Sequence, residues 1–158
     1  MKKIIFIIFL ITTSLCFGRW ENLNSESGTK TVAYFFTEKS IFHMGKIDYE
    51  GVVYYLSGLY NIGELTGNNS MERGKDKLDI RITIDNLSTS KTADVINEET
   101  GVITFIFDTQ NFEDIGIIEK MKKGKEMRFA ITTLNGDVII KKVNLLGFTK
   151  VFNNMNNQ

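Results

Sequence analysis

Residues 102–152 alternate between extended and helical patterns, and their order constrains the fold more than any other stretch of the chain. Residues 102–107 form a short run of apolar and β-branched side chains that is largely apolar on both faces, which is typical of a central strand. Helical spacing follows over residues 112–123, in Phe112, Ile115, Ile118 and Met121. The order predicts a strand that runs directly into a short amphipathic helix.

Both ends of this helix carry the expected signals. Asn111 can accept a hydrogen bond from a backbone N–H of the first turn, so we expect it to be the N-cap. Three lysines crowd the last turn, where cations suit the helix dipole, and Gly124 is placed as a left-handed stop. This end chemistry accounts for the lysines without a nucleic-acid or lipid partner.

A hairpin and a second helix are expected after Gly124. Asn135-Gly136 stands between two strand-like runs, which favours a two-residue turn. Such a turn pairs Leu134 with Asp137, and it sets the following pairs opposite one another: Ile131 with Ile140, and Phe129 with Lys142. The spacing of Phe148, Phe152 and Met155 then predicts a short helix that packs back on the sheet.

The same stretch resembles a known family. The series Ile118, Lys122-Lys123-Gly124-Lys125, Asn135-Gly136, Leu145-Leu146-Gly147-Phe148 and Val151-Phe152 is similar to the C-terminal part of the invasion-associated locus B family of exported bacterial proteins. The resemblance covers about a third of the chain and implies an exported β-sandwich-like domain with no known enzymatic activity. The chain departs from that family in having no cysteine after residue 16.

The first 18 residues read as a secretory signal peptide. Lys2 and Lys3 precede an apolar run over residues 4–11, and small residues suited to cleavage follow. We expect cleavage between Gly18 and Arg19, so that residues 19–158 form a single β-rich domain in the periplasm or outside the cell.

Cys16 is the only cysteine of the chain and has two interpretations. Cleavage after Gly18 removes it and leaves no thiol, disulfide or cysteine metal site. The alternative is a lipoprotein that is lipidated at Cys16, which is the one route by which we expect contact with a membrane.

Charge argues against a nucleic-acid partner. Of 19 basic residues, Lys2 and Lys3 leave with the signal peptide, so 17 remain against 19 acidic residues. Nucleic-acid binding relies on a cationic footprint, which a chain of net charge −2 lacks.

The middle of the chain reads as a series of short strands. Residues 31–37 and 52–60 are apolar and aromatic, while Leu78, Ile80, Ile82 and Ile84 alternate with polar residues. Residues 86–91 read as a turn and residues 92–97 as a short strand. Seven to nine short strands with two late helices predict a mainly β fold, an antiparallel β-sandwich or small barrel. A ferredoxin-like α+β layer is the alternative.

Binding candidates are aromatic and basic residues in and near these strands. Exposed tyrosines offer contact area at low entropic cost, and long polar loops often bind partners. The candidates are Trp20, Tyr54, Tyr55, Tyr60, Arg73 and Lys75. For each aromatic residue, packing into or over the core is the competing interpretation.

Motifs for phosphate loops, zinc proteases, calcium loops and serine hydrolases are absent from the sequence. His43 is the only histidine, and residues 42–45 read as a polar loop around it. Asp48 and Glu50 lie near it in sequence, so the alternatives to a loop histidine are a carboxylate-rich metal site and a catalytic base.

The sequence thus predicts an exported, non-enzymatic interaction module without a cofactor or metal, associated with virulence or envelope assembly. Its partner would be an unidentified protein of the envelope or the host. The alternative is a periplasmic hydrolase that uses scattered carboxylates with His43.

Overall fold

The computed structural model describes residues 19–23, 32–36, 40–65 and 77–157. Nine of the described segments are strands, and they form one sheet in the order β1-β2-β3-β4-β7-β6-β5-β8-β9. The strands are β1 (Arg19–Leu23), β2 (Val32–Phe36), β3 (Ile41–Tyr49), β4 (Val52–Tyr60), β5 (Lys77–Ile84), β6 (Leu87–Asn97), β7 (Val102–Asp108), β8 (Glu126–Thr132) and β9 (Val138–Asn144). The helices are α2 (Phe112–Lys123) and α3 (Phe148–Asn156).

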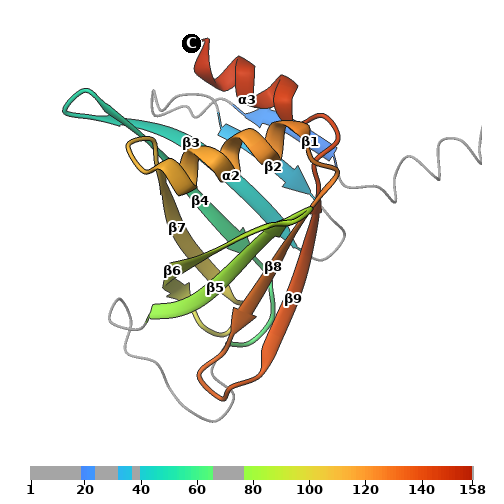
Figure 1. Ribbon diagram of the computed structural model, residues 1–158. Coiled ribbons are helices and arrows are strands. Elements are labelled where there is room, and N and C mark those ends of the chain that lie inside the picture. Colours follow the sequence, from blue (N-terminus) through green and yellow to red (C-terminus); the bar gives the residue numbers. More distant parts are fainter. Residues whose placement is uncertain (1–18, 24–31, 37–39, 66–76, 158) are drawn as a thin grey trace, which may run out of the picture.

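The sheet curls into a half-barrel, and α2 and α3 lie over its open top (Figure 1). The indole Nε1 of Trp20 in β1 donates to the carbonyl of Asn144 in β9 at 2.8 Å, so the two terminal strands of the sheet meet at one end. This architecture confirms the predicted mainly β, antiparallel class with two helices in the second half. The ferredoxin-like alternative is wrong, because that fold sets parallel strands side by side and every pairing here is antiparallel.

The inner face of the sheet holds the hydrophobic core, and strand alternation accounts for its membership. In β5 the four alternating apolar residues are all buried, as predicted: Leu78, Ile80, Ile82 and Ile84. Strand β7 lies between β4 and β6, which confirms its predicted central position. We call the face that carries the core and the helices inner, and the opposite, convex face outer.

Helix α2 begins at the predicted N-cap but buries a different stripe from the one expected. The Asn111 side chain accepts hydrogen bonds from the first turn, as predicted. Phe112 is 90% exposed and Ile115 is 38% exposed, so these two members of the predicted apolar face are wrong, whereas Ile118 and Met121 are buried as predicted. The buried stripe keeps i, i+3, i+4, i+7 spacing but begins at a carboxylate: Asp114, Ile117, Ile118 and Met121.

The predicted left-handed stop at Gly124 is also wrong. Its backbone is extended, with φ −76° and ψ 170°. The position needs glycine for a different reason, because a Cβ there would stand 2.6 Å from Cγ2 of Ile84 and 2.9 Å from the carbonyl oxygen of Lys120. Helix and sheet therefore approach each other closely at this point.

Strand β6 begins earlier than predicted. Residues 86–91 do not form a turn, because Asp85 and Asn86 make a two-residue connection and Leu87 already pairs with Ile84. Asp85 adopts a positive φ of 51°, which suits such a tight turn. Ser88 and Ser90 lie on the exposed outer face of this strand, whereas Thr89 lies opposite Ile82 on the inner face.

The β8–β9 hairpin turns through three residues instead of two. The backbone N–H of Thr133 donates to the carbonyl of Asp137 at 2.9 Å, and Gly136 carries the positive φ of 84°. Asn135 keeps a negative φ, so this is the three-residue loop that ends in a left-handed glycine.

This loop shifts the register by one residue. Ile131 lies opposite Ile139 and Phe129 opposite Lys141, each one position earlier than predicted. Ile140 consequently points to the outer face, where it is 54% exposed. A shift of one residue exchanges the faces of a whole strand, and this exchange leaves apolar side chains of β9 exposed.

Candidate protein-binding face

On the outer face of the sheet, the region formed by β5 and β6, which we call the polar half, differs from the region formed by β3, β4 and β7. Where β5 and β6 pair, the outward side chains are polar: Lys77, Asp79, Arg81, Thr83, Ser88, Ser90, Thr92 and Asp94. This composition is ordinary for a solvated sheet face. The exposed apolar exception on β6 is Ile96, which lies beyond this pairing at the bulge between Val95 and Asn97. The neighbouring strands β3, β4 and β7 present a different surface on the same side.

Five outward side chains of these three strands form what we call the outer apolar patch: Ile47, Tyr49, Tyr54, Leu56 and Ile106. Ile47 lies opposite Tyr54, and Leu56 lies opposite Ile106, so they are cross-strand neighbours. Tyr49 is 63% exposed, Ile106 50% and Ile47 39%. Contiguous exposed apolar side chains with few charges are typical of the centre of a protein interface.

Alternation along β4 explains how one strand serves both the core and this patch. Tyr55 and Leu59 point inward and are buried, whereas Tyr54 and Leu56 point outward and are partly exposed. In the sequence of β4, apolar residues occur at both odd-numbered and even-numbered positions, which normally indicates a strand covered on both faces. In the described part of the chain, no element covers the outer face of β4.

His43 lies in β3 on the same outer face, next to the patch. The predicted polar loop at residues 42–45 is therefore wrong, and the residue is buried. Its ring lies over Gly58 of β4, where a Cβ would stand 2.5 Å from the imidazole Cε1, and its centroid is 5.0 Å from that of Tyr60. Burial lowers the pKa of His43 to about 4, so the ring is neutral at physiological pH.

The geometry separates His43 from the carboxylates that lie nearest in sequence. Asp48 is five residues along the same strand, which places it on the opposite face and about 16 Å away. Glu50 lies beyond it in the β3–β4 turn, with a φ of 51°. Among the residues that the structure describes, no three or more His, Cys, Asp or Glu side chains gather as a metal site would require.

The structure divides the predicted binding residues among different environments. Tyr54 and Tyr60 lie on the outer face. Tyr55 is in the core, its hydroxyl donates to Oδ1 of Asn156 at 2.8 Å, and burial raises its pKa. Arg73 and Lys75 lie outside the described residues.

Trp20 packs at the end of the core, which confirms core packing, the alternative to a binding role for this residue. Its ring makes edge contacts with Phe42 at 5.8 Å and with Phe148 at 4.8 Å between centroids. With its Nε1 bonded to the carbonyl of Asn144, this residue joins β1 to β9 and to α3. It does not lie beside Tyr54 or the outer apolar patch.

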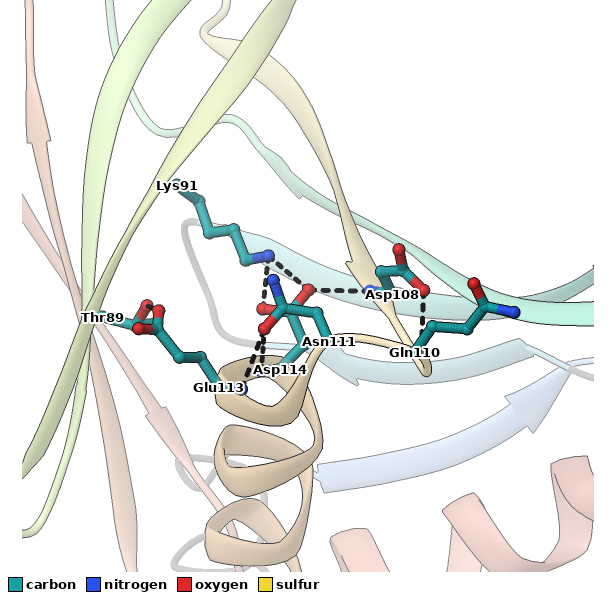
Figure 2. Close-up of polar contacts among 7 residues, drawn as sticks. All are labelled: Thr89, Lys91, Asp108, Gln110, Asn111, Glu113 and Asp114. Atoms are coloured by element: carbon teal, nitrogen blue, oxygen red, sulfur yellow. Dashed lines mark hydrogen bonds and ion pairs between the residues drawn. The ribbon is translucent and has the colours of Figure 1, made fainter.

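A buried ion pair on the inner face was not predicted from the sequence. Lys91 of β6 pairs with Asp114 of α2, whose side chain is 2% exposed (Figure 2). Asp114 also accepts from the backbone N–H of Asp108 at 2.8 Å, and Lys91 lies 5.6 Å from the ring centroid of Phe107. These contacts fasten the start of α2 to β6 and β7.

The same cluster includes Asn111, the N-cap of α2 (Figure 2). Asn111 accepts from the N–H groups of Glu113 and Asp114, and Glu113 accepts from the Thr89 hydroxyl at 3.5 Å. Both oxygens of the Asp114 carboxylate are contacted by Lys91, and one also accepts from the backbone N–H of Asp108. We assign this cluster to helix docking.

These features define a small half-barrel closed by two helices, with its unusual chemistry on the outer surface. No protein-family model matches the chain, and no curated protein matches it. The crystal structure of invasion associated protein B from Bartonella henselae is similar, with a TM-score of 0.59 and 12% sequence identity over 89% of this chain and 94% of that one. At this identity the likeness shows a shared fold over most of the chain, and the predicted resemblance to the family is supported at the level of the fold alone.

Neither α2 nor α3, the two helices in the described residues, has the length and apolar character needed to cross a membrane.

Proposed function

We propose that this chain is an exported bacterial interaction protein that binds a protein partner through the outer apolar patch. The observation that carries the proposal is the division of the outer face. The polar outer side chains of β5 and β6 show what a solvated face of this sheet looks like, and β3, β4 and β7 depart from it. The proposal includes no catalytic role.

Two further observations support an exported, host-associated role. The first 18 residues have the pattern of a secretory signal peptide. The chain also shares its fold with a protein named as invasion associated. Function can differ between proteins of one fold, so this likeness supports the class of role and leaves the partner to be found.

The chemistry of the patch favours a protein over a membrane. Tyrosine and isoleucine give an interface large contact areas and few charges. Its rim carries Asp108, which lies opposite Tyr54, and Glu50 lies at the end of the same hairpin. Peripheral membrane sites instead surround their apolar residues with Lys and Arg, and these carboxylates would be repelled by anionic lipid.

Matched surface variants test the proposal. Ile106→Arg places a charge in the patch, and Ser90→Arg places the same charge on the polar half of the outer face. Tagged versions of residues 19–158 would capture proteins from envelope extracts and host-cell lysates, with quantitative mass spectrometry as the readout. We expect at least one partner that Ile106→Arg loses by tenfold or more and Ser90→Arg retains, because a buried charge at an interface costs about 1.4 kcal/mol or more.

Equal capture by the two variants would contradict the proposal, provided that both unfold at the wild-type temperature. Both positions are exposed, so neither substitution should disturb the fold. Export is tested separately by the intact mass of the protein from its own cells. A soluble species that begins at Arg19 supports export with cleavage after Gly18, and a diacylated species that begins at Cys16 supports the lipoprotein alternative.

A further inference from the structure

Strand β9 is a terminal strand of the sheet, and its outward backbone groups can be identified from the ladder. Thr133 donates to the carbonyl of Asp137, and Leu145 donates to the carbonyl of Lys125, which fixes the bonded pairs at both ends of the β8–β9 hairpin. Antiparallel ladders alternate between bonded and non-bonded pairs. Ile139, Lys141 and Val143 therefore bond to β8.

The three alternate residues point their N–H and C=O groups away from the sheet: Val138, Ile140 and Lys142. No described residue takes up these groups. The backbone groups of Asn144 also point away from β8, and its carbonyl accepts from the Trp20 indole at 2.8 Å. The edge is thus closed at one end by β1 and open along the rest of the strand, at the margin of the sheet (Figure 1).

The side chains along this open edge have a definite pattern. Val138 is 57% exposed and Ile140 is 54% exposed, both on the outer face. Lys141 and Lys142 follow. Long exposed apolar edges are hazards for a free protein, and lysine on an edge strand restricts what can pair with it.

Charge beside the edge is positive. Arg128 of β8 lies opposite Lys142, and the nearby carboxylate of Glu126 is already held by Arg128 at 2.6 Å. Strand β9 contains no acidic residue. Two copies paired through β9 would therefore bring no carboxylate from that strand to Lys141 or Lys142, which argues against self-pairing.

We propose that β9 takes up an extended, acidic segment of a partner protein as an added antiparallel strand. In this pairing two carboxylates of the segment lie opposite Lys142 and Lys141, and the three residues that follow them, apolar or β-branched, lie opposite Ile140, Ile139 and Val138. Backbone hydrogen bonds between β9 and the added strand provide the affinity, and the two lysines favour a segment with acidic side chains. This inference concerns a different surface from the outer apolar patch and does not depend on it.

A labelled peptide tests the pairing directly. The probe carries the sequence Glu-Glu-Val-Thr-Val between flexible ends, and a second peptide replaces both glutamates with lysine. Fluorescence anisotropy with residues 19–158 measures both dissociation constants. We expect the acidic peptide to bind at least about fivefold more tightly, since each cross-strand charge pair contributes up to a few-fold in affinity.

Three variants separate edge pairing from general charge attraction. Ile140→Pro removes an outward N–H that β8 does not use, so the fold should persist while binding falls by tenfold or more. Lys142→Glu should abolish the preference for the acidic peptide, and Lys77→Glu on β5 should leave it intact. Wild-type binding by Ile140→Pro, or equal affinity for the two peptides, would overturn the proposal.

If Ile140→Pro fails to fold, the Lys142→Glu comparison still decides the result. A concentration-dependent dimer that Lys142→Glu leaves unchanged and that excludes the peptide would also overturn the proposal, because it would assign the edge to a second copy of the chain.

Discussion

His43 should make the stability of the folded domain depend strongly on pH between about 6.5 and 4. Burial lowers the pKa of His43 from 6.5 to about 4 in the folded state, whereas the unfolded chain keeps the ordinary value. Above pH 6.5 the ring is neutral in both states and contributes no pH dependence. As the pH falls below 6.5 the unfolded state gains a proton that the folded state does not, so stability is lost progressively until the pH reaches about 4.

The size of the loss follows from the two pKa values. Linkage predicts a loss of about 1 kcal/mol at pH 6, about 2 kcal/mol at pH 5 and about 3 kcal/mol at pH 4, relative to pH 7.5. A small domain is stable by only about 5–15 kcal/mol, so a change of this size is readily measured.

The matched variant is His43→Phe, which keeps an aromatic ring over Gly58 and beside Tyr60 but cannot titrate. Urea unfolding, followed by the fluorescence of the single tryptophan, gives the free energy of unfolding at pH 7.5 and pH 5.0 for both proteins. Carboxylates titrate equally in the two and cancel in the comparison. We expect the wild type to lose about 2 kcal/mol more than His43→Phe over this interval. Equal losses would refute the assignment of His43 to a buried, neutral state.

Three further substitutions test the packing. Asp114→Ala should cost about 3 kcal/mol, because it leaves Lys91 partly buried without its partner and releases the start of α2; thermal unfolding measures this, and a cost below 1 kcal/mol would contradict it. Gly124→Ala should cost about 1–3 kcal/mol although its φ is allowed, because the new Cβ meets Ile84; chemical denaturation that shows no loss would disprove the close approach. Trp20→Phe should cost about 1 kcal/mol through the lost indole hydrogen bond, and an unchanged unfolding midpoint would show that this bond is not needed.

Much of the fold was predictable because strand alternation and helix capping are local signals. The alternation over residues 78–84 identified β5 and its buried face, and Asn111 identified the start of α2. The errors share one cause, because contacts between residues distant in the sequence do not appear in local patterns. The buried stripe of α2 begins at Asp114, and only a partner from a distant strand makes a buried carboxylate acceptable there.

The hairpin register shows the same limit at shorter range. Asn135-Gly136 correctly marked a turn, but the dipeptide suits both two-residue and three-residue loops. The choice between them decides whether Ile139 or Ile140 faces the core. No local property distinguishes these two isoleucines, so the exposed edge of β9 could not be predicted.

The candidate site was predicted in part. Tyr54, Tyr55 and Tyr60 indicated an aromatic binding face, yet only the alternation of the folded strand separates Tyr54 on the outside from Tyr55 in the core. Ile47 and Ile106 come from strands on either side of β4, and nothing in the sequence places them on one face with Tyr54 and Leu56. The patch exists only through the strand order.

Site-specific photo-crosslinking in the native cells tests the central proposal most directly. A photoreactive phenylalanine analogue at Tyr54 lies within the outer apolar patch, and the same group at Thr92 lies on the polar half of the outer face. We expect ultraviolet light to give a discrete covalent adduct with another protein at Tyr54 and none at Thr92. Adducts at both positions, or at neither in cells that express and fold both variants, would contradict the assignment of the outer apolar patch as the partner-binding surface.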